Sequence, residues 1–524
     1  MDNKKIILVF IGVLIIIGLI SIISLYFIFP KNPSPVNNFP LNSVSTNDKQ
    51  NKCGNNICDV KEKANPKLCP QDCAVELQTC LEQNGSICLI SQNCSGFWIE
   101  ASDTTKCCSN ICNKKEILTS NDSPFGLQAP FCLKPRCSPS STYSESNVLN
   151  HLSDIGVKWV RIIPDGVDTG KLYEKSIGIE SGIARAEYPL DMDVYLEEIK
   201  LIVSQNKDYV KAWHIVNEAD AGWTDTNEKF VDYFSQISQV IKSECSDCVV
   251  ILNLAGGQPD MEGNFNRGLE RSITFFDDIS KNGIDKYYDI LDIHFQGYEN
   301  GYIFLKIKLD RFKEIMNKYN YDKPVWITEY ATYDGDPTPD RPTQSDYPYQ
   351  SETQQASGLV KKYIYGTSLG IEKMFWTTLY EWYNYNDNLN SYFSNVGLIH
   401  NSNTDGKGWK KLAYYTYKKM TEKLEGSDWN NIETIQESNN IYVYKFTNKK
   451  IGKSIWVAWS DSGSGSMSLN SLGITNAKVT EVVPDYDDGK QIVDNDVAYS
   501  SMFKEYIVVD SIQLGKAPIF IEKQ

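Results

Sequence analysis

The pattern of apolar and polar positions is most regular between residues 123 and 426. There, short apolar runs alternate with amphipathic segments whose apolar residues recur every three or four positions. This alternation is typical of parallel strands joined by crossover helices. Eight such units predict an α/β domain folded as a (β/α)8 TIM barrel. The predicted strands occupy residues 125–129, 158–163, 177–186, 213–218, 249–254, 289–295, 325–329 and 374–377.

The amphipathic segments predict the helices of this barrel. In residues 228–245, for example, the apolar side chains from Phe230 to Ile241 fall on one helical face. One part of the barrel is short, because only residues 164–192 remain for a helix and the third strand. We therefore expect an irregular barrel wall there. The predicted helices occupy residues 145–155, 193–205, 228–245, 304–319, 353–368 and 410–424.

After Gly426 the helical period stops. Apolar or alternating runs follow, separated by turns rich in Gly, Ser and Asn. Short alternating strands with frequent turns are typical of all-β modules. We predict a C-terminal β-sandwich over residues 427–524. Its predicted strands occupy residues 441–446, 454–459, 478–483, 505–509 and 518–521.

The N-terminal segment has a different pattern. Residues 6–29 form an almost unbroken apolar run without a charge, long enough to cross a bilayer, and Lys4 and Lys5 precede it. The positive-inside rule places the N-terminus in the cytoplasm and the rest of the chain outside the cell. A cleaved signal peptide is the alternative, but it would have a shorter apolar region ending in small residues. We predict a transmembrane helix as cell-membrane anchor over residues 1–30 and a flexible linker over residues 31–52.

Cysteine usage distinguishes the next segment. Twelve of the 14 cysteines lie between Cys53 and Cys137, in a turn-rich stretch expected outside the cell. That pattern predicts disulfide-rich modules over residues 53–117, too small to hold a core without bridges. A zinc cluster is the alternative, and it is less favoured because the segment has no His and its spacings are irregular. For the remaining pair, Cys245 and Cys248, we predict a local disulfide.

Net charge narrows the possible partners. The chain carries a formal net charge of −15 at pH 7, which argues against nucleic acid, because phosphates require basic patches. Aromatic residues make up 12% of the sequence, which suits stacking on sugar rings and equally an ordinary aromatic core. Composition alone therefore does not select a function.

Two of the predicted barrel strands end on a glutamate. Residues 213–218 close on Asn217 and Glu218, and residues 325–329 close on Glu329. Strands four and seven of such a barrel face each other across the cleft, so their terminal carboxylates can meet over a glycosidic bond. Each Glu alone would more often be a surface ion-pair partner. Two of them, each closing an apolar run, favour a paired-carboxylate site.

These stretches resemble the catalytic strands four and seven of the clan A retaining glycoside hydrolases, with families 39 and 5 nearest. The matching motifs are a Trp-x-x-x-Asn-Glu run closing on Glu218 and a Trp-Ile-Thr-Glu-Tyr run around Glu329. The resemblance implies an O-glycoside hydrolase that works by double displacement, with Glu329 as nucleophile and Glu218 as acid/base. It also implies a β-sandwich after the barrel, as several clan A families carry one.

Asn217 and Arg161 are expected to support this pair. Asn217 is expected to bind the sugar hydroxyl next to the reacting carbon. Arg161, near the end of the second strand, is expected to keep Glu329 ionised by its fixed positive charge. For His214, on the strand before Glu218, we expect a structural role.

The resemblance assigns three further residues to the sugar site. Clan A enzymes carry a His and a Tyr after strand six, with the Tyr hydroxyl on the nucleophile. The matching residues are His294 and Tyr298, with a His-x-x-x-Tyr spacing in place of the usual His-x-Tyr. Trp376 on strand eight is expected to form the apolar floor under the reacting sugar, and a packed core Trp is the alternative.

The sequence therefore predicts a membrane-anchored extracellular enzyme that hydrolyses an oligo- or polysaccharide. The predicted reaction needs no metal ion and no organic cofactor. The alternative is a catalytically inactive surface protein that binds carbohydrate, or acts in adhesion, on the same barrel. The presence of both Glu218 and Glu329 argues against that alternative.

Overall fold

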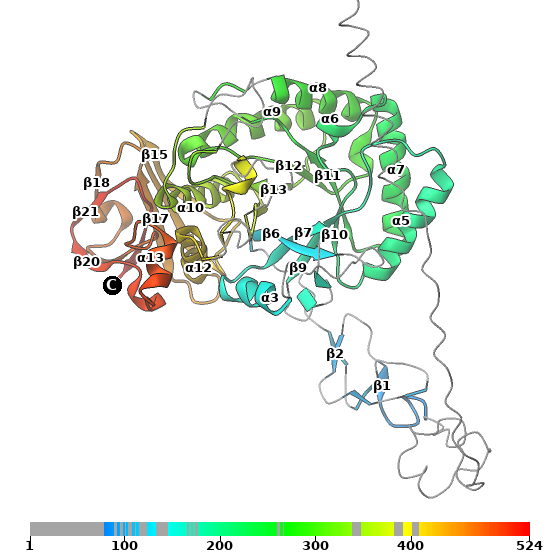
Figure 1. Cartoon of the computed structure of the whole chain (residues 1–524), viewed down its shortest axis with the longest axis horizontal. Helices are drawn as coiled ribbons and strands as arrows, with labels where there is room; N and C mark the ends of the chain where they lie inside the picture. The colour runs from blue at the N-terminus through cyan, green and yellow to red at the C-terminus, as the bar shows by residue number, and fades with distance from the viewer. Residues whose placement is uncertain are drawn as a thin grey trace, which may run out of the picture. The chain divides into compact units, whose positions relative to one another are not determined.

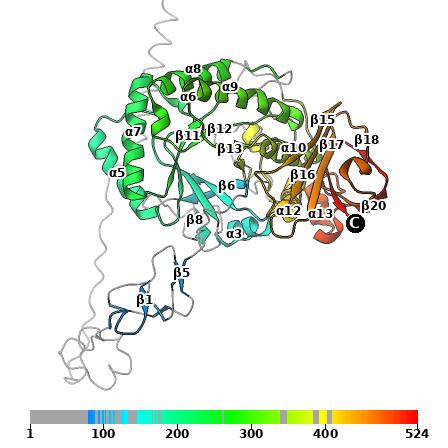
Figure 2. The same cartoon turned by 180° about the vertical axis from the view of Figure 1, so that it is seen from behind.

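Figures 1 and 2 show a computed structural model of the chain. The described residues divide into two compact units, the first containing residues 78–87 and 98–109 and the second containing the remainder. The structure describes residues 78–524 apart from residues 88–91, 95–97, 100, 103–106, 110–111, 115–122, 133–144, 165–166, 169–170, 173–176, 259–262, 266, 338–346, 382–390 and 401–407.

Eight parallel strands close into a barrel in the second unit (Figure 1). They are β6 (Phe125–Cys132), β7 (Trp159–Pro164), β9 (Gly178–Gly182), β10 (Ala212–His214), β11 (Val249–Leu254), β12 (Ile290–Ile293), β13 (Val325–Tyr330) and β14 (Lys373–Trp376). The strands neighbour one another in chain order, and β14 pairs back onto β6. The short β8 (Val167–Asp168) adds to the end of β6. The predicted barrel is therefore confirmed, including its third strand, β9.

Inward-facing side chains of the barrel are sorted into layers. Because these side chains alternate along a strand, residues two apart point to the same side. An apolar layer is followed two positions later by polar residues such as Arg161, Asn253 and Asp292. The apolar layer is thus the base of a buried polar layer near the carboxyl ends of the strands. The apolar layer consists of Trp159, Ala212, Ile251, Ile290, Trp326 and Phe375.

Helices surround the barrel and bury their apolar faces against its outer side (Figures 1 and 2). We did not predict α8, although Leu269, Ile273, Phe276 and Ile279 are buried at helical spacing. The main helices are α3 (Glu145–Asp154), α5 (Met192–Asn206), α7 (Asn227–Glu244), α8 (Arg267–Lys281), α9 (Leu305–Lys318), α10 (Glu352–Ser368) and α12 (Leu412–Leu424).

The C-terminal region forms an antiparallel sheet with the strand order β15, β16, β17, β22, β19 and β20. These strands are β15 (Glu433–Ser438), β16 (Ile441–Thr447), β17 (Ser454–Ser460), β19 (Asn476–Glu481), β20 (Glu505–Val509) and β22 (Ile519–Lys523). A pair, β18 (Gly465–Ser468) and β21 (Ser511–Leu514), covers one face through a small apolar core. The opposite face packs against the barrel helices. The predicted sandwich is thus one large sheet with a small second layer.

In the first unit, β1 (Ser86–Ile87), β4 (Cys107–Cys108) and β3 (Trp98–Ile99) form an antiparallel sheet, and Cys80 is bridged to Cys107. Disulfides in this region are thereby confirmed in part. The predicted bridge Cys245–Cys248 also forms.

The predicted anchor and linker, residues 1–52, lie outside the described residues. Among the residues that are described, no helix combines the length and the apolar character needed to span a bilayer.

Candidate active site

Glu218 lies beyond the end of a strand. β10 stops at His214, and the chain turns before the short helix α6 (Ala219–Gly222). The predicted strand over residues 213–218 is therefore wrong in its second half. Glu218 adopts a left-handed backbone conformation, with φ 49° and ψ 54°, and its N–H donates to Asn253 Oδ1 at 2.5 Å. That bond to β11 holds the turn and fixes the direction of the Glu218 side chain.

Glu329 lies on β13, as predicted, and both of its carboxylate oxygens accept hydrogen bonds. Arg161 Nη1 donates to Oε1 at 3.0 Å, and Gln296 Nε2 donates to Oε2 at 3.1 Å. Arg161 also donates to the backbone carbonyl of Thr328 at 3.2 Å. These contacts orient the carboxylate, and its side chain remains 13% exposed.

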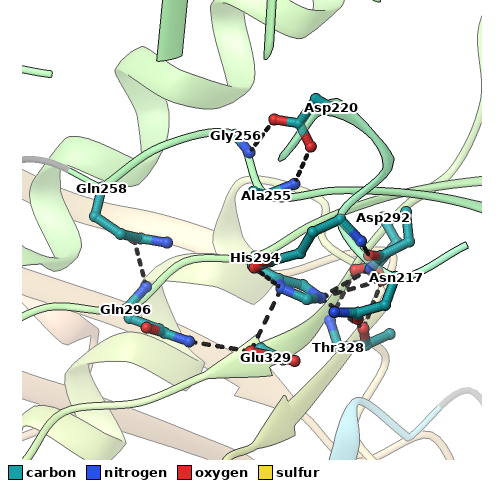
Figure 3. A network of polar contacts seen from close by, with 12 residues as sticks. Asn217, Asp220, Ala255, Gly256, Gln258, Asp292, His294, Gln296, Thr328 and Glu329 are labelled. Atoms are coloured by element: carbon teal, nitrogen blue, oxygen red, sulfur yellow. Dashed lines mark hydrogen bonds and ion pairs between the residues drawn. The ribbon is translucent and has the colours of Figure 1, made fainter. Parts of the chain in front are cut away.

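His294 lies between the two carboxylates, and Figure 3 shows it beside Glu329. Its Nδ1 is 2.8 Å from Glu218 Oε1 and 3.4 Å from Glu329 Oε2. One polar atom from each of these three side chains lies within 4.8 Å of the other two. Paired carboxylates about 5 Å apart have the separation used for double displacement at a sugar carbon, whereas a wider gap would admit a water molecule between them.

The three side chains are also of the types that ligate a divalent metal ion. The guanidinium of Arg161, 3.0 Å from Glu329, places a fixed positive charge beside them. That charge disfavours a cation at the same place. The arrangement therefore fits an acid–base pair better than a metal centre.

A buried polar network fixes the far side of the His294 ring (Figure 3). Asn253 Nδ2 lies 2.8 Å from His294 Nε2 and also donates to Asp292. Asp292 accepts from the backbone and the hydroxyl of Thr328 at 2.8 and 2.5 Å. Since Asn253 and Arg161 both present N–H groups to Nε2, the neutral ring carries its hydrogen on Nδ1, facing the carboxylates.

The electrostatics of the site favour an ionised Glu218. Burial alone would raise the pKa of Glu218, but the hydrogen bond and charge of His294, together with Arg161, lower it to about 2. Burial would lower the pKa of His294, but Glu329 and the bond to Glu218 raise it above its ordinary 6.5. The carboxylate and the ring thus favour each other's charged forms.

Another buried carboxylate lies beside Arg161. Glu180 on β9 is fully buried, with Oε2 3.5 Å from Arg161 Nε, and its other oxygen bonds His214. The expected structural role of His214 agrees with this position. Arg161 also donates from Nη2 to Asn217 Oδ1 at 2.5 Å. A single guanidinium therefore fixes Glu329 and Asn217 together.

Trp376 and Tyr298, the remaining predicted residues, do not have the positions that the resemblance implies. Trp376 is fully buried in the core and donates from Nε1 to the Val396 carbonyl at 3.0 Å. It presents no exposed face to a sugar, which corresponds to the core alternative. Tyr298 packs, partly buried, against the aromatic cluster that contains Tyr392. The bond to Glu329 that the resemblance assigned to a Tyr is made instead by Gln296.

Sequence reasoning missed four residues of the site: Asn253, Asp292, Gln296 and Glu180. Asn253 and Asp292 interrupt otherwise apolar strands, and a buried polar residue inside such a strand is informative by itself. Gln296, in contrast, lies in the loop after β12, where no sequence signal separates it from its neighbours. Its N–H donates to Gln258 Oε1 at 2.7 Å, so a second loop holds its position.

The fold and the site together define a (β/α)8-barrel protein with a histidine-linked pair of carboxylates at the carboxyl ends of its strands. No protein-family model matches the sequence, and no curated protein matches it either.

Among solved structures, the chain is similar to a glucosidase from Croceicoccus marinus, with 11% identity over 76% of this chain and 95% of the other and a TM-score of 0.47. It is also similar to a GH51 arabinofuranosidase from Xanthomonas axonopodis pv. citri, with 11% identity, 77% and 96% coverage and a TM-score of 0.47.

Proposed function

We propose that the protein is a retaining O-glycoside hydrolase acting on an oligo- or polysaccharide. The observation that carries the proposal is the separation of the carboxylates, since oxygens of Glu218 and Glu329 lie within 4.8 Å of each other. At that spacing one carboxylate reaches the anomeric carbon while the other reaches the departing oxygen.

In the first step, Glu329 attacks the anomeric carbon. The bond from that carbon to the leaving oxygen breaks, a glycosyl ester of Glu329 forms, and Glu218 delivers a proton to the leaving oxygen. Arg161 and Gln296 hold the two oxygens of Glu329, so the nucleophile is oriented before substrate arrives. In the second step, Glu218 takes a proton from water, which attacks the same carbon and releases Glu329.

The first step needs a proton that Glu218 does not hold at neutral pH, because its pKa is about 2. We propose that the pair of Glu218 and His294 supplies it. The ring keeps its hydrogen on Nδ1, and the pair takes up one further proton, because Glu329 and Glu218 raise the pKa of His294 and the two groups titrate together. Transfer of that proton from Glu218 to the leaving oxygen leaves Glu218 ionised and the neutral ring with its hydrogen still on Nδ1.

The test is the stereochemistry of the first-formed product. A soluble chain covering the barrel and the C-terminal sheet would be screened against chromogenic glycosides and polysaccharides, and the anomer released by the best substrate would be followed by proton NMR. Retained configuration is expected, because two displacements occur at one carbon. First-formed product of inverted configuration would overturn the proposal.

The bond between His294 and Glu218 also favours a second candidate, a carbohydrate-binding surface protein without turnover. A glutamate with a pKa of about 2 is a poor acid by itself. Binding of glycans without hydrolysis of any of them would select this candidate.

We further propose that the chain is anchored in the cell membrane with the barrel outside. The proposal rests on the apolar run at residues 6–29 and on Lys4 and Lys5 before it. Protease added to intact cells is expected to remove the barrel domain. Complete protection of that domain, with a known extracellular protein digested in the same sample, would contradict this topology.

A further inference from the structure

A buried lysine lies beside the candidate active site. Lys308, on α9, is fully buried, and its Nζ donates to three backbone carbonyls. These belong to Ala255 at 3.0 Å, Gly257 at 2.8 Å and His294. A single ammonium group therefore joins the loop after β11 to the backbone of the histidine between the carboxylates.

The loop at residues 255–257 is shaped to accommodate this ammonium group. Gly256 has a φ of +69°, and a Cβ at this position would lie 2.2 Å from Lys308 Cε and 2.6 Å from Nζ. Only glycine adopts that backbone conformation without strain and leaves the space open. The loop thus bends around the lysine and directs its carbonyls toward the charge.

The opposite side of the same loop is held by Asp220. Its Oδ1 accepts from the N–H of Ala255 at 2.7 Å and its Oδ2 from that of Gly256 at 3.4 Å (Figure 3). Asp220 lies two residues after Glu218, in the short helix that Glu218 begins. The loop is therefore fixed on one side to the segment of Glu218 and on the other, through Lys308, to His294.

We propose that Lys308 is a positioning residue which, through the loop at residues 255–257 and Asp220, sets the distance between Glu218 and His294. The inference rests on the proposed glycosidase function and deepens it. Lys308 bonds the backbone carbonyl of His294, while Asn253 Oδ1 accepts from the N–H of Glu218. Without the ammonium group, three carbonyls at the strand ends would lose their shared donor and move apart.

The charges around Lys308 agree with this role. Burial lowers the pKa of Lys308 to about 7, while Asp220, Glu218 and Asp292 counteract that effect. Lys308 in turn contributes to the low pKa of Glu218. Replacing it by an uncharged residue should therefore change the protonation of the pair as well as its geometry.

The chain offers a matched control in Lys362 on α10. This side chain is also fully buried, and burial lowers its pKa to about 7 as well. Within the described residues its Nζ has no hydrogen-bond partner and lies about 5 Å from the ring centres of Phe295 and Tyr330, at 5.1 and 5.0 Å. A Lys362→Met variant thus loses a buried ammonium of the same kind without losing a bond to the loop.

The first measurement is steady-state kinetics of Lys308→Met and Lys362→Met on the best substrate. Lys308→Met is expected to lower kcat by about 10- to 100-fold, because small misplacements of catalytic groups cost that much. KM should change little, because Lys308 does not face the substrate. Addition of n-propylammonium to Lys308→Ala should restore part of kcat, whereas n-propanol of the same size should not.

The second measurement needs no turnover. The chain has four histidines, so a sample labelled at histidine Cε1 gives few ring signals, and His294→Asn identifies the one from His294. Lys308→Met is expected to raise the pKa of His294 measured in this way, because a neighbouring positive charge is removed. If Lys308→Met does not fold, Asp220→Asn provides the second variant. Its side-chain amide cannot accept from the N–H groups of both Ala255 and Gly256, so it should also shift the His294 signal.

The two measurements separate the two proposals. Absence of turnover in the unmodified protein would overturn the glycosidase function, and the histidine signals would still decide the role of Lys308. A shift of the His294 signal confined to Lys308→Met and Asp220→Asn supports the positioning role. Equal effects of Lys308→Met and Lys362→Met on that signal, or no effect of either, would overturn it.

Discussion

At the scale of single residues, the site depends on what surrounds two glutamates of the same type. Glu329 accepts bonds from Arg161 and Gln296, whereas Glu218 bonds His294 and is 36% exposed. The more exposed carboxylate suits proton exchange with water and a leaving group. The more enclosed one, held at both oxygens, suits attack from a fixed direction.

Replacement of Glu329 and replacement of Glu218 should therefore affect turnover in different ways. Glu329→Ala is expected to lower turnover by several orders of magnitude on every substrate, because no other group can form the glycosyl ester. Glu218→Ala should still react with dinitrophenyl glycosides, which need no proton for the first step, and then stall. Azide should restore its turnover as a glycosyl azide of retained configuration, detected by mass spectrometry and NMR. Full activity in either variant would show that the pair is not catalytic.

The fall of kcat/KM at alkaline pH should follow the pKa of His294 in its pair with Glu218. Because the pKa of His294 is raised above 6.5, its pair with Glu218 holds a second proton below that pKa and loses it as pH rises through it. Activity on glycosides with poor leaving groups should fall over that range, and activity on dinitrophenyl glycosides should stay level. In His294→Asn this fall should move to lower pH, because Glu218 then titrates alone. An unchanged fall in this variant would identify another proton donor.

At the scale of elements, the loops after β13 and β14 are tied to the start of α12. Lys411, fully buried at that start, bonds Asp334 Oδ1 at 2.5 Å and also bonds Glu381, whose second oxygen lies 3.0 Å from His400 Nδ1. Burial would raise the pKa of Glu381, but Lys411 and His400 lower it to about 2. The lysine thus serves as the counter-ion that lets two acidic loops pack at the carboxyl end of the barrel.

Lys411→Met should destabilise the fold by about 3–5 kcal/mol, because it removes the positive charge that two buried carboxylates share. The free energy of unfolding in urea at pH 7 would measure this. Lys410→Met, at a partly exposed neighbouring position, should cost about 1 kcal/mol or less. Since the folded pKa of Glu381 lies below its ordinary 4.5, its contribution is present above pH 4.5 and is lost as pH falls towards 2. Equal stability of the two variants would contradict this account.

The bounds of the strands and helices also show where a local sequence pattern is enough to predict secondary structure. The sequence predicts β11 with its observed bounds, because the strand is a continuous run of mostly apolar residues. It predicts α7 to within one residue at each end, because the buried apolar residues of this helix recur at helical spacing. β10 was predicted too long, because Ile215 and Val216 are buried without belonging to a strand. Burial and regular secondary structure coincide in β11 and α7, whereas in residues 215–216 after β10 the side chains are buried without a strand.

At the scale of the whole molecule, the barrel and the C-terminal sheet share one core. Tyr444, Trp459 and Phe520 of the sheet belong to the same apolar cluster as the barrel helices. Polar contacts cross the same boundary, since Tyr302 donates to Asp461 at 2.6 Å and Lys361 lies 3.1 Å from the same carboxylate. The sheet therefore completes the barrel domain and does not form an independent module.

A chain that ends at residue 426 should not fold stably, because it exposes the barrel surface that this shared core covers. Thermal unfolding followed by circular dichroism, with binding of a hydrophobic dye, would compare it with residues 123–524. The shorter chain should show no cooperative transition and strong dye binding. A cooperative transition at the same temperature in both chains would show that the sheet is dispensable.

Local sequence patterns were enough to predict the barrel, the region of β-strands that follows it, the bridge Cys245–Cys248 and the pairing of Glu218 with Glu329. These features are local, because periodicity, spacing and charge-free runs are properties of neighbouring residues. Tertiary structure alone decided that His294 lies between the carboxylates, that Gln296 bonds Glu329, and that Trp376 is enclosed in the core. Each of these depends on contacts between residues far apart in the chain, and no local pattern records which distant side chain fills a given space.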